Sequence, residues 1–293
     1  MQGLTVDRAV VSLAKIFAPG QAYVALSRVR TLSGLVLQDF KENRIYCRED
    51  VKEAMNNMAP FVTRNLLQHT LHPHSFTVFY MNVQSLTRHV ADLTACAQHF
   101  QPNCIAVTET WLSATSTLES VKIDVFSFYN SPRSSSYSSS HPALIALQDQ
   151  QHGGAGMYRS ENVVCDILDV QRLNLECVVS RFDRWNIVMA VVYRPPSYPV
   201  SLFKKNLGHL LAYLDPLSNT VVVMGDFNDD IFKSSTISQF VTSRGYVQLV
   251  NQSTTEKGTS IDHVYVKTTQ YHVEAKVVPT YFSDHEGVVL SCW

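Results

Sequence analysis

Polar side chains that suit phosphate chemistry follow apolar runs at five places in the last three-quarters of the chain. Carboxylate and amide oxygens are the ligands that hard divalent cations prefer, and imidazole and phenol groups can donate or accept protons. Together they predict metal-assisted hydrolysis of a phosphodiester. The groups are Asn82, Glu109, Tyr193, the pair Asp226 and Asn228, and the pair Asp284 and His285.

The string Gly225-Asp226-Phe227-Asn228 is the sharpest of these signals. An apolar run ends at Gly225, where we expect a tight turn, and Asp226 and Asn228 then project from the same side of an extended backbone. One of them can accept a proton and the other can donate to a phosphate oxygen. The alternative is a simple turn, because Gly, Asp and Asn favour turns in any context.

Glu109 and Asn82 stand where predicted strands emerge from the core. Glu109 follows the run CIAVT, and Asn82 follows FTVFYM. At a strand exit, a single carboxylate with an amide beside it can hold a metal ion. The alternatives are a solvated loop glutamate and a turn asparagine.

His285 has a neighbouring carboxylate in Asp284 and a second candidate partner in Asp262. By accepting the second ring proton, Asp262 would orient the imidazole and fix its tautomer. The alternative is a structural histidine. Tyr193 ends another apolar run, so its hydroxyl could donate to a phosphate oxygen or a leaving group, and Arg194 adds a planar cation. The alternative for Tyr193 is an aromatic residue on the rim.

The elements that must position these groups alternate between strands and helices. Leu86, Val90, Leu93, Ala97 and Phe100 recur at helical spacing, and so do apolar residues between 203 and 214. The pattern predicts an α/β fold. Because residues 131–142 are rich in Ser and Pro, we expect a flexible insertion there. The predicted strands are FTVFYM, CIAV, IVMAVVY, TVVVM and IDHVYV.

The totals limit the class of protein. The 24 basic and 25 acidic residues nearly cancel, so contact with a polyanion must come from a local patch or a bound metal ion. Six cysteines without a CxxC pair indicate reduced, intracellular thiols. No apolar run is long enough to span a membrane and the start is unlike a signal peptide, so we expect an intracellular protein without membrane association. The spacing of the apolar residues differs on the two sides of residues 56–75. We therefore predict a linker there, which separates residues 1–55 from a domain at 76–293.

Residues 76–293 resemble the endonuclease/exonuclease/phosphatase superfamily, which includes the apurinic/apyrimidinic endonucleases. The strings TETWL, VYRPPS, MGDFN, GTSIDHVYV and SDH are most similar to endonuclease domains of non-LTR retrotransposons. The resemblance implies a two-sheet α/β sandwich with flanking helices, DNA as partner, a nuclear location, and Mg²⁺ or Mn²⁺ as cofactor.

The resemblance also implies a role for each residue. Glu109 is the principal metal ligand with Asn82 beside it, and Asp226 activates the attacking water. Asn228 holds the scissile phosphate. His285, oriented by Asp262, binds that phosphate and stabilises its charge. Asp284 assists the metal or the leaving group, and Tyr193 supports the pentacovalent state.

Residues 1–55 resemble a different family. QGLTVDRAVV and GQAYVALSRVRTLSGL are similar to the last two motifs of superfamily-one helicases of the Helitron transposon type, which implies a partial RecA-like segment. There Arg28 is the arginine finger, with Gln2, Gly3 and Gln21 in supporting motifs. None of the eleven glycines precedes a lysine, so the chain has no phosphate loop and we expect these residues to be vestigial, without ATPase activity.

The leading functional prediction is a metal-dependent DNA endonuclease of transposon origin. Two alternatives stay open at this point. One is a phosphatase of the same superfamily that acts on a small phosphorylated molecule, and the other is a catalytically inactive transposon relic that binds DNA.

Overall fold

The computed structural model describes residues 5–14, 16–57, 75–113, 115–138, 141–150 and 152–293. The chain divides into two compact units, Met1–Val62 and Thr63–Trp293, here called the N-terminal and C-terminal units. Most of the predicted linker, residues 56–75, lies outside the described residues, as do Gln2 and Gly3.

The N-terminal unit is built around two parallel strands. Strand β1 (Ala9–Ser12) pairs with β2 (Leu35–Gln38), and helix α1 (Gln21–Leu26) comes between them in the sequence. The 3₁₀ helices η1 (Leu32–Gly34) and η2 (Glu42–Arg44) and helix α2 (Glu49–Asn57) complete it. Its buried cluster comprises Leu13, Ile16 and Ala22, whereas Phe17 is 80% exposed and Leu32 86%. Two strands and one small cluster provide little stability on their own.

The C-terminal unit contains two six-stranded sheets. Sheet I has the order β13 (Val273–Val278), β14 (Gly287–Cys292), β3 (Phe76–Asn82), β4 (Cys104–Thr108), β6 (Ala155–Ser160) and β5 (Phe126–Ser131). Sheet II has the order β11 (Val247–Gln248), β12 (Asp262–Thr268), β10 (Thr220–Asp226), β9 (Ile187–Tyr193), β8 (Glu176–Phe182) and β7 (Asp166–Leu168). The five strands predicted from the sequence are β3, β4, β9, β10 and β12, so this prediction is confirmed.

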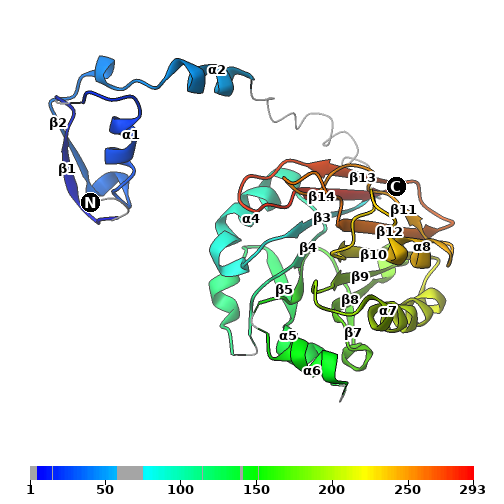
Figure 1. Ribbon diagram of the computed structural model, residues 1–293. Helices are drawn as coiled ribbons and strands as arrows, with labels where there is room; N and C mark the ends of the chain where they lie inside the picture. Colours follow the sequence, from blue (N-terminus) through cyan, green and yellow to red (C-terminus); the bar gives the residue numbers. More distant parts are fainter. Residues whose placement is uncertain (1–4, 15, 58–74, 114, 139–140, 151) are drawn as a thin grey trace. The chain divides into compact units, whose positions relative to one another are not determined.

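Helices cover the outer faces of both sheets (Figure 1). Helix α4 (Leu86–Phe100) packs its apolar stripe on sheet I, and α7 (Val200–Leu214) packs Phe203, Leu207 and Leu211 on sheet II. Both helices lie where the spacing predicts them. The remaining elements are α5 (Arg133–Ser136), α6 (Pro142–Gln148), α8 (Thr236–Thr242), η3 (Leu118–Val121), η4 (Gln171–Leu173), η5 (Asp183–Trp185) and η6 (Asp215–Leu217).

The main core lies between the two sheets. It is formed by inward-facing side chains such as Phe76 and Tyr80 of β3, Met189 of β9 and Met224 of β10. Because both faces of the central strands are covered, β3, β9 and β10 are buried along their whole length, and this explains their almost unbroken apolar sequences. The predicted two-sheet α/β sandwich is confirmed.

The Ser-rich segment differs from the prediction. Within it, residues 133–136 form α5, and both Arg133 and Tyr137 are buried against Glu176 of β8. The expected flexible insertion is therefore wrong for the described part of this segment. The prediction was based on the small number of apolar residues in the segment. It could not include the hydrogen bonds of Arg133 and Tyr137 to Glu176, which is distant in sequence.

Within the described residues, no helix combines the length and the apolar composition that crossing a bilayer requires.

Candidate active site

The predicted polar groups meet at one end of the sandwich, and each sheet contributes about half of them. Asn82 ends β3 and Glu109 follows β4, both in sheet I. Tyr193 and Asp226 end the parallel strands β9 and β10 of sheet II and are register partners. The antiparallel β12 begins there with Asp262, which is paired with Asp226. Parallel pairing brings carboxyl ends to one edge of a sheet, and this explains the shared location.

Asn82 links the two principal carboxylates. Its buried Nδ2 donates to Glu109 Oε1 at 3.1 Å and to Asp226 Oδ2 at 2.9 Å. One amide nitrogen can reach both oxygens only if the two carboxylates face a common point. That arrangement joins an acid of sheet I to an acid of sheet II across the sandwich.

Glu109 is held on both of its oxygens. Oε1 also accepts from the Tyr193 hydroxyl at 3.1 Å, and Oε2 accepts from Trp111 Nε1 at 3.0 Å. Burial, and then the negative charge of Glu109, raise the pKa of the Tyr193 hydroxyl, so it stays protonated and acts as a donor. The structure therefore places this hydroxyl on Glu109, and support of the pentacovalent state by Tyr193 stays a prediction.

The end of β10 differs in geometry from the turn expected at Gly225. Gly225 makes no turn but lies within β10 at φ +147°, and a Cβ there would lie 1.8 Å from the Val192 carbonyl oxygen. The glycine is needed for this close approach to β9. The chain turns later, at Asn228, whose φ is +47° and whose backbone N–H donates to Asp226 Oδ1 at 2.8 Å. The expected extended backbone from Asp226 to Asn228 is therefore wrong.

Asn228 and Arg194 also have partners other than those expected. Asn228 Nδ2 donates to the Arg194 carbonyl oxygen at 2.9 Å and to Asp226 Oδ2 at 3.2 Å, so its two N–H groups are used within the protein. The Arg194 guanidinium is buried and donates to the carbonyls of Phe227, Asn228 and Tyr198. Both side chains therefore brace the turn that carries Asp226, and the contact of Asn228 with the scissile phosphate stays a prediction.

His285 is oriented by Asp262, the arrangement that the sequence analysis anticipated. The ring Nδ1 lies 2.7 Å from Asp262 Oδ2, and Asp262 Oδ1 accepts from the Tyr80 hydroxyl at 2.7 Å. All three side chains are buried. Burial opposes a charge on the imidazole, but Asp262 outweighs it and raises the pKa of His285 to about 10. At neutral pH the ring is therefore an imidazolium.

Asp226 lies in a strongly negative environment. Burial raises the pKa of its carboxyl well above the ordinary value, and the neighbouring Asp262 raises it further. Asp226, Asp262 and His285 present potential ligand atoms within 4.8 Å of one another, but both oxygens of Asp262 already accept hydrogen bonds. The carboxylate oxygens of Glu109 and Asp226 accept hydrogen bonds too, but they face a common point at Asn82, where these three side chains could hold a cation. This oxygen-rich set fits Mg²⁺ or Mn²⁺, whose charge would offset the crowding of acids.

Asp284 lies beside His285 rather than against Glu109. Its Oδ1 is 3.8 Å from His285 Nε2 and has no hydrogen-bond partner among the residues that the structure describes. The preceding Ser283 donates to the Asn82 carbonyl oxygen at 2.9 Å, and this bond ties the Ser283–His285 loop to the end of β3. The Asp284 side chain is 45% exposed although Oδ1 itself is buried, so the carboxylate as a whole is open enough to assist a cation or a leaving group.

Sequence reasoning missed several supporting residues. Tyr80 reads as one more apolar residue of β3, and Arg133 and Glu176 carry no local signal because their partners are distant in sequence. Trp111 follows Glu109 so closely that the TETW string could have indicated it. Its ring lies 4.2 Å from that of His152 and 6.0 Å from the Arg88 guanidinium carbon, so it forms an aromatic and basic rim beside Glu109.

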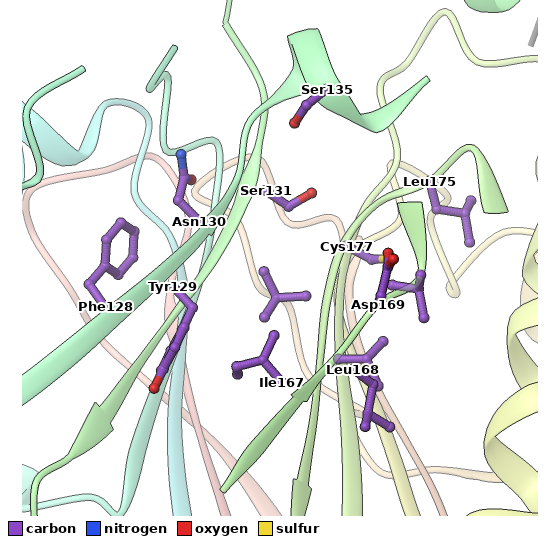
Figure 2. A pocket seen from close by; sticks show the side chains of 13 residues that line it. Phe128, Tyr129, Asn130, Ser131, Ser135, Ile167, Leu168, Asp169, Leu175 and Cys177 are labelled. Carbon is purple, nitrogen blue, oxygen red and sulfur yellow. The ribbon is translucent and has the colours of Figure 1, made fainter. Parts of the chain in front are cut away.

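A separate pocket of about 420 Å³ lies between β5 and the strands β7 and β8 (Figure 2). Figure 2 shows Tyr129 and Asn130 on one side of it, and Ile167 and Leu168 on the other. Its described lining includes none of the predicted site residues.

Comparison with known proteins agrees with the fold. Residues 80–285, more than half of the chain, match the profile of the Endonuclease/Exonuclease/phosphatase family. The AP endonuclease LMAP from Leishmania major superposes with a TM-score of 0.59 at 14% identity, covering 82% of this chain and 94% of that protein. An AP endonuclease from Archaeoglobus fulgidus gives 0.54 at 13% identity, with 73% and 98% covered. A mannosyl-6-phosphatase from Bacteroides thetaiotaomicron gives 0.56 at 13%, with 74% and 99% covered.

Curated relatives match only a short stretch. The ATP-dependent DNA helicase PIF1 of Danio rerio is 50% identical over 50 residues, which are 17% of this chain and 8% of that protein. The human helicase of the same name is 52% identical over 46 residues, which are 16% of this chain and 7% of that protein. The chain therefore spans less than a tenth of the length of these relatives.

Proposed function

The chain belongs to the Endonuclease/Exonuclease/phosphatase family, and we propose that its C-terminal unit is a DNA endonuclease that hydrolyses phosphodiester bonds with Mg²⁺ or Mn²⁺. One observation carries the proposal. The carboxylates of Glu109 and Asp226 face a common point at Asn82, and the His285–Asp262 pair lies within reach of Asp226.

In this proposal the acidic residues have two different roles, cation binding and proton transfer. Glu109 and Asn82 hold the cation, and Asp284, whose side chain is 45% exposed, assists. When bound, the cation offsets negative charge on the phosphate. Asp226 in its ionised form accepts a proton from the attacking water; burial and Asp262 raise the pKa of its carboxyl to about 8, and a bound cation would lower that pKa and favour the carboxylate. The Asn228 backbone N–H keeps the Asp226 carboxylate in one orientation.

His285 supplies positive charge at the phosphate. Its Nδ1 proton is directed at Asp262, so Nε2–H is the donor that remains for a phosphate oxygen. Charge on that oxygen grows in the transition state, and a fixed imidazolium stabilises it without reorganisation. Tyr80 holds Asp262 from the other side, which limits rotation of the pair.

The rim beside Glu109 favours DNA over a small phosphorylated molecule. Trp111, His152 and Arg88 together offer aromatic rings and a cation next to the carboxylates. Such surfaces contact bases and phosphates of a nucleic acid, whereas a small phosphate ester would not extend to them. We expect cleavage to leave 3′-hydroxyl ends.

Plasmid nicking tests the proposal. In Mg²⁺ the purified chain should convert supercoiled plasmid to open circle, and chelation by EDTA or the change Asp226→Ala should abolish this. Asp215→Asn is a suitable control, because Asp215 binds Lys267 and Tyr246 and none of the groups described above.

The alternatives have distinct outcomes in the same experiment. Asp226-dependent hydrolysis of mannose 6-phosphate without nicking would identify a phosphatase. DNA binding without either activity would identify an inactive relic.

For the N-terminal unit we propose a vestigial helicase segment of transposon origin. The short helicase matches support this, because residues 1–55 carry the strings that resemble helicase motifs. Gln21 Oε1 accepts from the backbone N–H groups of Phe17 and Ala18, so this side chain is used within the unit. We expect no ATP turnover, because the chain lacks a phosphate loop. ATP turnover by the purified chain would contradict this assignment.

A further inference from the structure

Arg133 and Glu176 form a buried ion pair next to the candidate active site. Arg133 Nε lies 2.7 Å from Glu176 Oε1, and the two side chains are 8% and 0% exposed. Buried ion pairs contribute little net stability, because removing both charges from water costs about as much as their attraction returns. A pair at this depth therefore needs an explanation other than stability.

Glu176 holds the turn before β6 and one end of the Ser-rich segment. Its carboxylate accepts from Arg133, from the Tyr137 hydroxyl at 2.7 Å and from the Gly154 backbone N–H. Three donors on one carboxylate restrict its position closely. Tyr137 and Arg133 come from the segment that composition alone describes as unstructured.

Arg133 touches two groups that lead toward the site. A Cβ on Gly153 would lie 2.3 Å from Arg133 Nη2, so the guanidinium packs directly on that backbone. The guanidinium carbon also lies 5.7 Å from the centre of the Tyr193 ring. In addition, the Gly153 carbonyl oxygen accepts from the Trp111 backbone N–H at 2.9 Å.

Arg133 is thus connected to Tyr193 directly and to Trp111 through Gly153, and both of these residues contact the Glu109 carboxylate. Tyr193 donates to Glu109 Oε1, and Trp111 donates to Glu109 Oε2. We propose that Arg133 and Glu176 are a positioning pair that fixes the Glu109 carboxylate through Tyr193 and Trp111, and thereby sets the affinity of the chain for its divalent cation. This inference rests on the proposed function, in which Glu109 binds that cation.

The experiment measures cation binding without DNA. Mn²⁺ alone is titrated by calorimetry into the full-length wild-type chain and into the variants Arg133→Lys and Tyr137→Phe. Arg133→Lys keeps the charge but removes the planar group that lies over Tyr193, and we expect the Kd for Mn²⁺ to rise about tenfold. Tyr137→Phe removes one of the three donors to Glu176, and we expect a smaller rise of about threefold.

A second buried tyrosine provides the matched control. Tyr158 is as buried as Tyr137 and its hydroxyl donates to the Val121 carbonyl oxygen, in the cluster beneath α4. Tyr158→Phe therefore loses the same kind of bond, and we expect its Kd for Mn²⁺ to equal that of the wild type. Thermal unfolding of each variant separates a change in stability from a change in affinity.

The outcomes are distinguishable. Wild-type affinity in folded Arg133→Lys and Tyr137→Phe chains would refute the positioning role and leave the proposed function intact. If Arg133→Lys does not fold, Tyr137→Phe against Tyr158→Phe decides the question. A wild-type chain that binds no Mn²⁺ would refute the cation site itself, and the positioning role with it.

Discussion

The two halves of the candidate site differ in how far they are closed to solvent. Around His285, the imidazole, Asp262 and Tyr80 are buried and bonded to one another. Around Glu109, the carboxylate is only half-buried, and its partner Trp111 leads out to the rim, whereas its other partner, Tyr193, is buried. The first half holds a charge in a fixed place, and the second leaves a carboxylate accessible.

This difference corresponds to two chemical tasks. A fixed imidazolium stabilises developing charge best when its surroundings are dry and already oriented. A carboxylate that binds a cation must be accessible from solvent, because Mg²⁺ in particular keeps several water molecules when it binds. We infer that Asp226, which touches both halves through Asn82 and through its proximity to His285, is where the two tasks meet.

The largest effect should come from Asp226 itself. For Asp226→Asn we expect the nicking rate to fall about 10³-fold to 10⁴-fold, because a general base contributes on this scale. Folding should persist, because the change removes a buried charge that the nearby Asp262 disfavours. Single-turnover nicking and thermal unfolding measure the two quantities. A rate within tenfold of the wild type would place the base elsewhere.

The second prediction separates the halves directly. Glu109→Ala should weaken Mn²⁺ binding by roughly 100-fold. Changing a residue that only supports a metal ligand lowers metal affinity by up to about 100-fold, so losing a ligand itself should cost at least as much. His285→Ala should leave Mn²⁺ binding near the wild-type value and lower turnover about 10²-fold to 10³-fold. Calorimetry with Mn²⁺ and nicking assays on the same preparations test this. Equal Mn²⁺ binding by wild type and Glu109→Ala would remove Glu109 from the ligand set.

The third prediction concerns the pH dependence of the closed half. The pKa of His285 in the folded chain, about 10, lies above the ordinary value of about 6.5. The folded chain therefore binds this proton more tightly than the unfolded chain does. The resulting contribution to the free energy of unfolding is fully present below the ordinary pKa and is lost as pH rises through about 10. In Asp262→Asn the imidazole loses its main counter-charge and keeps only the weaker effects of Asp226 and Asp284, so the loss should be smaller and turnover should fall about 10-fold to 100-fold. Thermal midpoints between pH 6 and 10.5 compare the two chains, and parallel curves would contradict the assignment.

The smallest effect should come from the rim. Trp111→Phe keeps an aromatic ring but removes the Nε1 donor to Glu109, and we expect a decrease in nicking of about threefold to tenfold. Trp111→Ala should in addition raise the KM for DNA, because it also removes the stacking surface. Steady-state kinetics distinguish these effects. An unchanged KM in Trp111→Ala would exclude the rim as a DNA contact.

Much of the fold could be predicted because its signals are local. The buried runs that became β3, β9 and β10, and the helical spacing in α4 and α7, depend only on residues within one element. The order of the polar groups at strand ends also indicated that they meet. The turn expected at Gly225 was wrong, and the contacts of Arg194 and Asn228 could not be predicted, because these three residues meet backbone atoms of other strands and turns, which no local pattern specifies.

The sequence by itself determined the α/β class, the five strands with polar ends and the set of groups fit for phosphate chemistry. Alternation and composition act over a few residues, so they are readable along one chain. Only the tertiary structure decided which oxygen faces which nitrogen: Asn82 between Glu109 and Asp226, Tyr80 on Asp262, and Arg133 on Glu176. Hydrogen bonds depend on distances of a few tenths of an ångström between residues far apart in sequence, and only packing of the two sheets sets those distances.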